Sequence, residues 1–119
     1  MATPLSILVV EDEPLIAMML EDFIDGLGHR VAATADSVGD ALGHAEAGGF
    51  DIAILDVHLR DGEPSWPVAD ALADRGIAFL IATGGHVEPP PPRHAAVPQL
   101  AKPFTMEAVR SALDAARMP

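Results

Sequence analysis

The chain contains no cysteine and no tyrosine, and aromatic residues make up only 4% of its 119 residues. The absence of cysteine excludes disulfide bonds, thiolate zinc sites and thiol catalysis, and it fits a reducing compartment. Basic residues are few, 7 against 18 acidic ones, so the net charge of −11 argues against direct nucleic-acid binding. No run approaches the ~18 consecutive apolar residues of a membrane span, and no signal peptide is indicated. We therefore expect an acidic, cytoplasmic protein without membrane insertion.

Apolar residues follow two alternating patterns along the chain. Short patterns typical of buried strands occupy residues 5–10, 30–34, 51–56 and 77–83. Helical patterns occupy residues 14–27, 37–48, 64–76 and 105–117. One face of the first helix is predicted to be apolar: Leu15, Ile16, Met19, Leu20, Phe23, Ile24 and Leu27. Strands that alternate with helices predict βαβ units, and therefore an α/β fold with a parallel sheet covered on both faces.

The segment between residues 84 and 104 breaks this alternation. Its four consecutive prolines, Pro89 to Pro92, cannot lie inside a helix, because each lacks an N–H group and clashes with the preceding turn. They favour an extended, polyproline-like conformation. The helix that the alternation places here is therefore predicted to be shortened or absent. Residues 97–101 are expected to form a fifth strand, which Pro98 confines to the edge of the sheet.

Chemically active side chains follow the predicted strands, at the point where each strand ends. They are Glu11 and Asp12 after the first strand, Asp56 at the third, Thr83 at the fourth and Lys102 at the fifth. Because open α/β sheets bind ligands outside the carboxyl ends of their strands, we expect these side chains to lie together.

This set of side chains favours phosphoryl chemistry. Carboxylates in close contact raise one another's pKa, and a divalent cation such as Mg²⁺ removes that penalty. Asp56 could act as a nucleophile, while Thr83 and Lys102 donate to phosphoryl oxygens. Taken singly, each residue has a simpler interpretation: a helix N-terminus for the acidic run, turn residues for Asp56 and Thr83, and a solvated side chain for Lys102. Their occurrence together at consecutive strand ends favours a site.

The segments ILVVEDE, AILDVHLRDG, IAT and AKPF together resemble the receiver domain of two-component response regulators, over essentially the whole chain. The resemblance implies a flavodoxin-like, doubly wound, five-stranded parallel sheet, and the prolines depart from the family in that we expect the fourth helix to be shortened or replaced by a proline-rich loop. It implies that Asp56 is the phosphoacceptor and that Asp12 and Asp56 bind Mg²⁺ directly. Glu11 is then expected to orient a metal-bound water, and the backbone carbonyl of His58 to add a ligand.

The resemblance also assigns the remaining residues of the site. Thr83 is expected to be the switch hydroxyl and Lys102 the phosphate-contacting lysine, with a cis bond before Pro103. One departure concerns Gln99, which stands where the family usually has Tyr or Phe, so the usual aromatic switch is not expected. The segment IATGGH (81–86) partly resembles the FAT GUY receivers of alphaproteobacteria.

The resemblance predicts a phosphoacceptor receiver, not an enzyme beyond its own phosphorylation and dephosphorylation. Its expected partners are a sensor histidine kinase or histidine phosphotransfer protein and a downstream effector, unless it acts as a phosphate sink. Residues 1–119 are expected to form one receiver domain without an output domain. Two alternatives stay open. A phosphohydrolase with an aspartate nucleophile requires a second aspartate where this chain has His58, and a pseudo-receiver would bind partners without phosphorylation.

Overall fold

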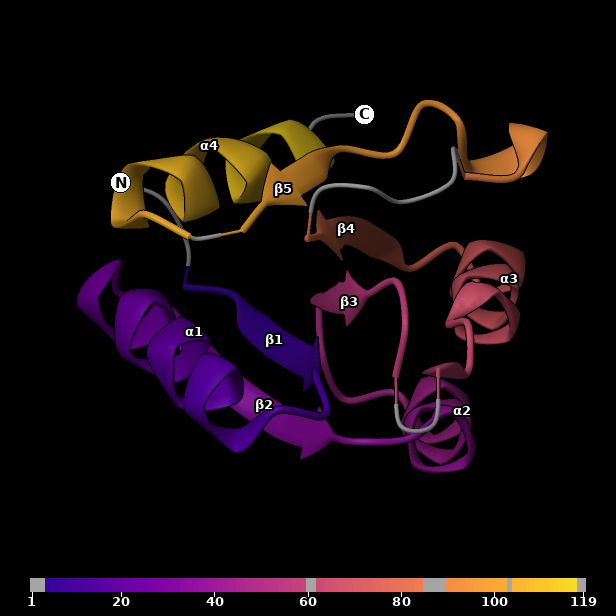
Figure 1. Cartoon of the computed structure of the whole chain (residues 1–119). Helices are drawn as coiled ribbons and strands as arrows, with labels where there is room; N and C mark the ends of the chain where they lie inside the picture. Colours follow the sequence, from indigo (N-terminus) through magenta and orange to yellow (C-terminus); the bar gives the residue numbers. More distant parts are fainter. Residues whose placement is uncertain (1–3, 60–61, 85–89, 103, 118–119) are drawn as a thin grey trace.

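The computed structural model describes residues 4–59, 62–84, 90–102 and 104–117. Five parallel strands form one sheet in the order β2-β1-β3-β4-β5 (Figure 1). The strands are β1 (Ser6–Val10), β2 (Arg30–Ala35), β3 (Ile52–Asp56), β4 (Ala78–Thr83) and β5 (Gln99–Ala101). Because the strand order reverses direction at β1, this is the doubly wound, flavodoxin-like sheet that the sequence predicts.

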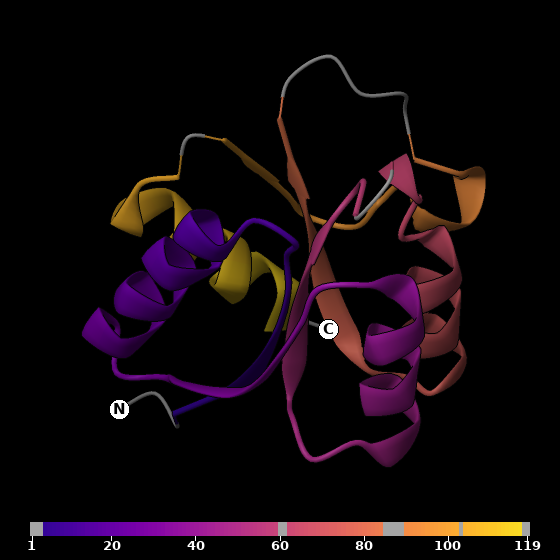
Figure 2. The ribbon, with the colours of Figure 1, turned by 60° about the horizontal axis from the view of Figure 1, so that its bottom comes forward.

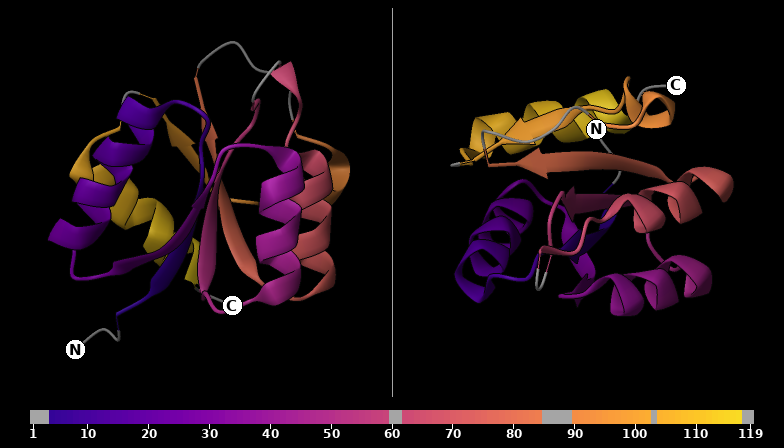
Figure 3. Two further views of the ribbon diagram at one scale, coloured as in Figure 1. Left: turned by 90° about the horizontal axis from the view of Figure 1, so that it is seen from below. Right: turned by 45° about the vertical axis from the view of Figure 1, so that its right-hand side comes forward.

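Four α-helices cover the two faces of the sheet: α1 (Pro14–Gly26), α2 (Val38–Ala47), α3 (Trp66–Asp74) and α4 (Met106–Arg117). Helices α1 and α4 lie on one face, and α2 and α3 lie on the other (Figure 3). The predicted helix starts are confirmed where the structure records caps. The Ser37 hydroxyl accepts a hydrogen bond from the Asp40 amide (3.2 Å), and the Thr105 hydroxyl accepts one from the Ala108 amide (3.1 Å). None of the helices in the described part of the chain is long and apolar enough to cross a bilayer.

The central strands supply both layers of the core. Every residue of β1 and of β3 is buried, as expected for strands covered on both faces. Successive side chains point to opposite faces, so Leu8 and Val10 pack toward α2 and α3, whereas Ile7 and Val9 pack toward α1 and α4. This burial fixes the register of β1 and β3, and therefore the positions of the residues that follow them.

The connection between β4 and β5 differs, in its described residues, from the helical connections after the earlier strands. Among its described residues the only helical element is a single 3₁₀ turn, η2 (Pro92–His94), so the predicted loss of a full helix is confirmed. The turn lies beside α3 (Figure 2). The fifth strand is short, and it pairs with β4 alone at the edge of the sheet, where Pro98 was expected to confine it.

Candidate functional site

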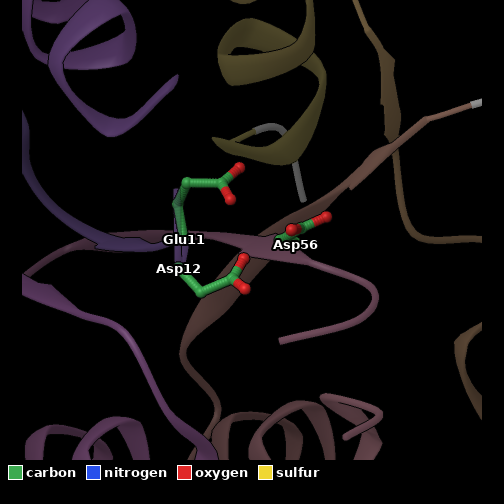
Figure 4. Close-up of side chains that lie close together, drawn as sticks. All are labelled: Glu11, Asp12 and Asp56. Atoms are coloured by element: carbon green, nitrogen blue, oxygen red, sulfur yellow. The ribbon is translucent and has the colours of Figure 1, made fainter. Parts of the chain in front are cut away.

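Three carboxylates converge at the carboxyl ends of the two central strands. Glu11 and Asp12 directly follow β1, and Asp56 is the last residue of β3. The two strands are paired neighbours, with Val10 opposite Leu55, so their ends meet at one edge. One carboxylate oxygen from each acidic residue lies within 4.8 Å of the others, and Figure 4 shows the three side chains drawn together. The predicted convergence of the acidic residues is confirmed.

Lys102 places its ammonium group between two of these carboxylates. Its Nζ atom lies 3.1 Å from Oε1 of Glu11 and 3.2 Å from Oδ1 of Asp56. The Glu11 side chain is only 1% exposed and that of Lys102 is 21% exposed, so solvent screens these contacts weakly. One ammonium group among three carboxylates leaves an excess of negative charge when all of them are ionised.

The surroundings of the cluster shift the pKa values of Glu11 and Lys102. Burial raises the pKa of Glu11 to about 7, and the nearby Asp56 carboxylate also raises it, whereas the Glu13 amide and Lys102 lower it. Burial lowers the pKa of Lys102, but the Asp56 and Glu11 carboxylates outweigh it and raise that pKa above its ordinary value. The cluster therefore keeps Lys102 charged and carries Glu11 as an ionised group only at a cost.

The donor set fits a hard divalent cation. Oε1 of Glu11 is buried and, apart from its ion pair with Lys102, accepts no hydrogen bond. Its other oxygen, Oε2, accepts a hydrogen bond from the Glu13 amide (3.1 Å), at the start of α1. The simple interpretation of the acidic run as a helix N-terminus is thus partly correct, but one buried oxygen is left over. Such oxygen donors are the ligands that Mg²⁺ prefers.

The two remaining predicted residues lie at the ends of the next pair of strands, β4 and β5. Asp56 lies opposite Ala82 in β4, so Thr83 follows at the same edge of the sheet. The Lys102 amide donates a hydrogen bond to the carbonyl oxygen of Thr83 (2.8 Å), which ties the end of β5 to the end of β4. The structure therefore brings Thr83 and Lys102 to the edge that holds the carboxylates, as predicted.

Three other residues that the sequence analysis names are His58, Pro103 and Gln99. His58 lies just beyond Asp56, exposed and bridged to Pro64, and the role of its carbonyl stays a prediction. Pro103, with its predicted cis bond, lies outside the described residues. Gln99 begins β5, and its side chain is exposed at the position where the family usually has an aromatic ring.

An apolar surface beside the site differs from what the helical spacing predicts. Leu15 and Met19 belong to the face of α1 that was expected to be buried, yet they are 78% and 39% exposed, and Met18 is 56% exposed. The buried residues of α1 are Leu20 and Ile24, and these three side chains lie outside the core clusters of the described residues. A cleft of about 340 Å³ opens next to them, and it is lined by Ile16, Met19, Gly84, Lys102 and Phe104.

The chain is similar to solved structures of bacterial regulators, although no family model matches it. It is 52% identical to SdrG from Sphingomonas melonis Fr1, with a TM-score of 0.88 over 99% of this chain and 100% of SdrG. A BeF3-activated conformation of SdrG from Pseudomonas melonis Fr1 is 55% identical, with a TM-score of 0.79 over 92% of this chain and 93% of that one.

PhyR proteins are further relatives. The REC domain of the Erythrobacter litoralis PhyR response regulator is 28% identical, with a TM-score of 0.73 over 98% of this chain and 95% of that domain. The phyllosphere-induced regulator PhyR of Methylorubrum extorquens is 44% identical over 57 residues, which are 47% of this chain. The match spans only 21% of that regulator's length. By its likeness to SdrG over nearly the full length of both chains, the protein belongs to the response regulator receiver domains of the SdrG and PhyR type.

Proposed function

We propose that this receiver accepts a phosphoryl group from a phosphohistidine onto Asp56, with Mg²⁺ as the metal, and signals through protein contacts. The observation that carries the proposal is the meeting of three carboxylates and one lysine at the carboxyl edge of the sheet. Phosphoryl transfer needs little beyond positioning and charge neutralisation, and this edge offers both.

Asp56 is the nucleophile of the proposed reaction. One of its carboxylate oxygens forms a bond to phosphorus, the bond between phosphorus and the donor imidazole nitrogen breaks, and that nitrogen keeps the electron pair. Asp12 and Asp56 would hold Mg²⁺ directly, Glu11 would hold a water on it, and the His58 carbonyl would complete the protein ligands. Bound Mg²⁺ supplies neutralisation of the clustered negative charge.

Lys102 and Thr83 serve the transferred group. The ammonium group of Lys102 already lies 3.2 Å from Asp56 Oδ1, within reach of an oxygen on a group attached there. Thr83 ends the neighbouring strand, next to Ala82, and its hydroxyl would donate to a second phosphoryl oxygen. The protein catalyses only its own phosphorylation and dephosphorylation in this proposal.

The exposed apolar surface of α1 (Leu15, Met18 and Met19) supports a protein as the phosphoryl donor. It lies next to the cleft that includes Lys102, so a partner bound there is beside the site. Methionine side chains adapt to varied partner surfaces, and contiguous exposed apolar residues mark interaction sites. We infer that a sensor histidine kinase or histidine phosphotransfer protein docks here. Leu15→Asp should slow transfer from such a protein and leave phosphorylation by acetyl phosphate unchanged.

The outcome of phosphorylation has two forms within the proposal. The phosphorylated receiver either contacts an effector protein or drains phosphoryl groups from its kinase. With Gln99 exposed where the family has an aromatic ring, an effector would recognise the phosphorylated edge by other means than ring rotation.

Intact mass after incubation with acetyl phosphate and Mg²⁺ tests the proposal. The wild type should gain one phosphoryl mass, and Asp56→Asn should gain none. Asp51→Asn, at the opposite end of the same strand, is the matched control and should gain the group like the wild type. No gain in the wild type, together with no spectral response to beryllofluoride and Mg²⁺, would favour an interaction module that works without phosphorylation.

A further inference from the structure

His94 is buried in the connection that lacks a full helix. His94 is only 1% exposed, although it lies in the short η2 turn. Its ring stacks on Trp66 of α3, with ring centroids 6.2 Å apart and an angle of 14°, and it meets Phe79 of β4 edge-on at 5.6 Å. Its Nε2 atom lies 2.7 Å from Oδ1 of Asp70, also on α3. One side chain therefore ties the β4–β5 connection to both the helix and the sheet.

Arg93 adds a second, weaker tie to the same helix. It pairs with Asp74, and its Nη1 atom lies 3.6 Å from Oδ1 of Asp70. All three side chains are about half exposed, and exposed ion pairs contribute little to stability. The buried ring of His94 is therefore the main anchor of this turn.

The anchored turn leads directly into the strand that carries Lys102. The Val97 amide donates to the His94 carbonyl oxygen (3.1 Å), and the Ile81 amide donates to that of Pro98 (3.0 Å) just before β5 begins. Strand β5 has only three residues, and only Leu100 among them is buried. Lys102 directly follows β5, so the contacts that fix the start of β5 also fix the position of Lys102.

Packing around this segment is open. A cleft of about 320 Å³ lies between the segment and α4, lined by Phe79, Arg93, Val97 and Ala115 among others. Among the described residues of the connection and of β5, His94 and Leu100 are the buried side chains, and Val97 packs against the core as a partly buried one.

We propose that His94 is a positioning residue for Lys102, because it anchors the connection that sets the place of β5. The inference rests on the proposed function, in which Lys102 contacts the phosphoryl group on Asp56. A displacement of Lys102 by a fraction of its 3.2 Å contact with Asp56 would weaken that contact during transfer.

The proposal separates two measurable properties. Glu11 and Asp12 follow β1 and Asp56 ends β3, whereas the ring of His94 meets Trp66, Asp70 and Phe79, which lie on α3 and β4. Loss of the anchor should therefore lower the rate of phosphorylation without weakening Mg²⁺ binding, because a displaced Lys102 takes no carboxylate away from the metal. A purely structural role would lower the free energy of unfolding but leave the rate in the folded protein intact.

The test is a double-mutant cycle with acetyl phosphate as the donor, in which the phosphorylation rate is followed by intact mass and Mg²⁺ affinity by titration. His94→Ala should slow phosphorylation about tenfold. In the Lys102→Ala background it should have almost no further effect, because the residue through which it acts is gone. His44→Ala, which changes a partly exposed side chain on α2, is the control and should change neither property. Emission from Trp66, the single tryptophan, reports whether the ring stack is lost.

Asp70→Ala provides a second variant, since Asp70 is half exposed and its loss leaves the core intact should His94→Ala fail to fold. It should slow phosphorylation in the same direction. Equal slowing by His94→Ala in both backgrounds, or unchanged rates despite altered Trp66 emission, would overturn the role of His94 alone. A wild type that takes no phosphoryl group would overturn the proposed function, and this inference with it.

Discussion

The charged side chains at the two ends of the sheet differ in whether they meet complementary partners. At the amino end, the Ser6 amide donates to Asp51 (2.8 Å), and the Arg30 side chain donates to the Ser6 hydroxyl (2.6 Å). The Leu5 amide donates to Nδ1 of His29 (3.0 Å). Each of these polar groups meets a complementary partner, so this end joins β1, β2 and β3 and contributes to stability.

At the carboxyl end of the sheet, strands β1 and β3 lead into side chains of like charge. Glu11, Asp12 and Asp56 share a single nearby ammonium group, that of Lys102, and burial raises the pKa of Glu11 to about 7. Such an arrangement costs stability in the absence of a ligand. Strand pairing is therefore secured at one end of the sheet, while the other end gathers the excess negative charge on which the proposed Mg²⁺ and phosphoryl site depends.

The largest expected effect separates the cations of the two ends. Lys102→Ala should slow phosphorylation by acetyl phosphate by about 100-fold, because the transferred group loses its charged donor. Arg30→Ala, which removes the cation of the amino end, should leave the rate unchanged. Both rates are measured by intact mass over time. Equal slowing by both variants would erase the distinction between the ends.

Removal of a carboxylate should have opposite effects on metal binding and on stability. Glu11→Gln should weaken Mg²⁺ binding by about 10- to 100-fold, because Glu11 is expected to hold a metal-bound water. The same change should stabilise the metal-free protein, since it removes a buried charge beside Asp56. Titration with Mg²⁺ and urea unfolding measure the two effects. A variant that is destabilised without metal would contradict this description of the site.

At the amino end, the corresponding change should affect stability alone. Asp51→Ala leaves the Ser6 amide without its acceptor and should lower the free energy of unfolding by about 1 kcal/mol. Mg²⁺ affinity and phosphorylation rate should match the wild type. Urea unfolding gives the first quantity, and the assays above give the others. A loss of Mg²⁺ affinity here would show that the two ends are coupled.

The last expected effect is a dependence of stability on pH. The pKa of Glu11 is raised from 4.5 to about 7 in the folded protein. Between these two pH values, the folded state therefore binds more protons than the unfolded state. Stability of the metal-free protein should therefore fall as pH rises from 4.5 to about 7. Mg²⁺ binds the ionised form and should reduce this fall. In Glu11→Gln the slope should be smaller, and an unchanged slope would assign the effect to other groups.

The sequence predicts the acidic edge well because its signals are local. Each site residue follows directly after a buried apolar run, and parallel strands bring their carboxyl ends to one edge. The register that places Asp56 opposite Ala82 then follows from burial of alternating side chains. The shortened connection between β4 and β5 is also local, since consecutive prolines exclude a helix wherever they occur.

The sequence does not predict contacts that depend on tertiary packing. The stacking of Trp66 on His94, for example, joins two segments with no shared sequence pattern. A buried histidine in a proline-rich turn resembles an exposed one in sequence. The helical spacing likewise places Leu15 on the apolar face of α1, which usually packs on the core, whereas Leu15 is exposed in the structure.

Identification of the phosphorylated residue tests the central claim most directly. Protein treated with acetyl phosphate and Mg²⁺ is reduced with borohydride, which converts an aspartyl phosphate to homoserine, and its peptides are sequenced by mass spectrometry. The account predicts homoserine at position 56 alone, and none without acetyl phosphate. Homoserine at position 12, or phosphoryl mass with no homoserine at any aspartate, would contradict the assignment of Asp56 as the acceptor.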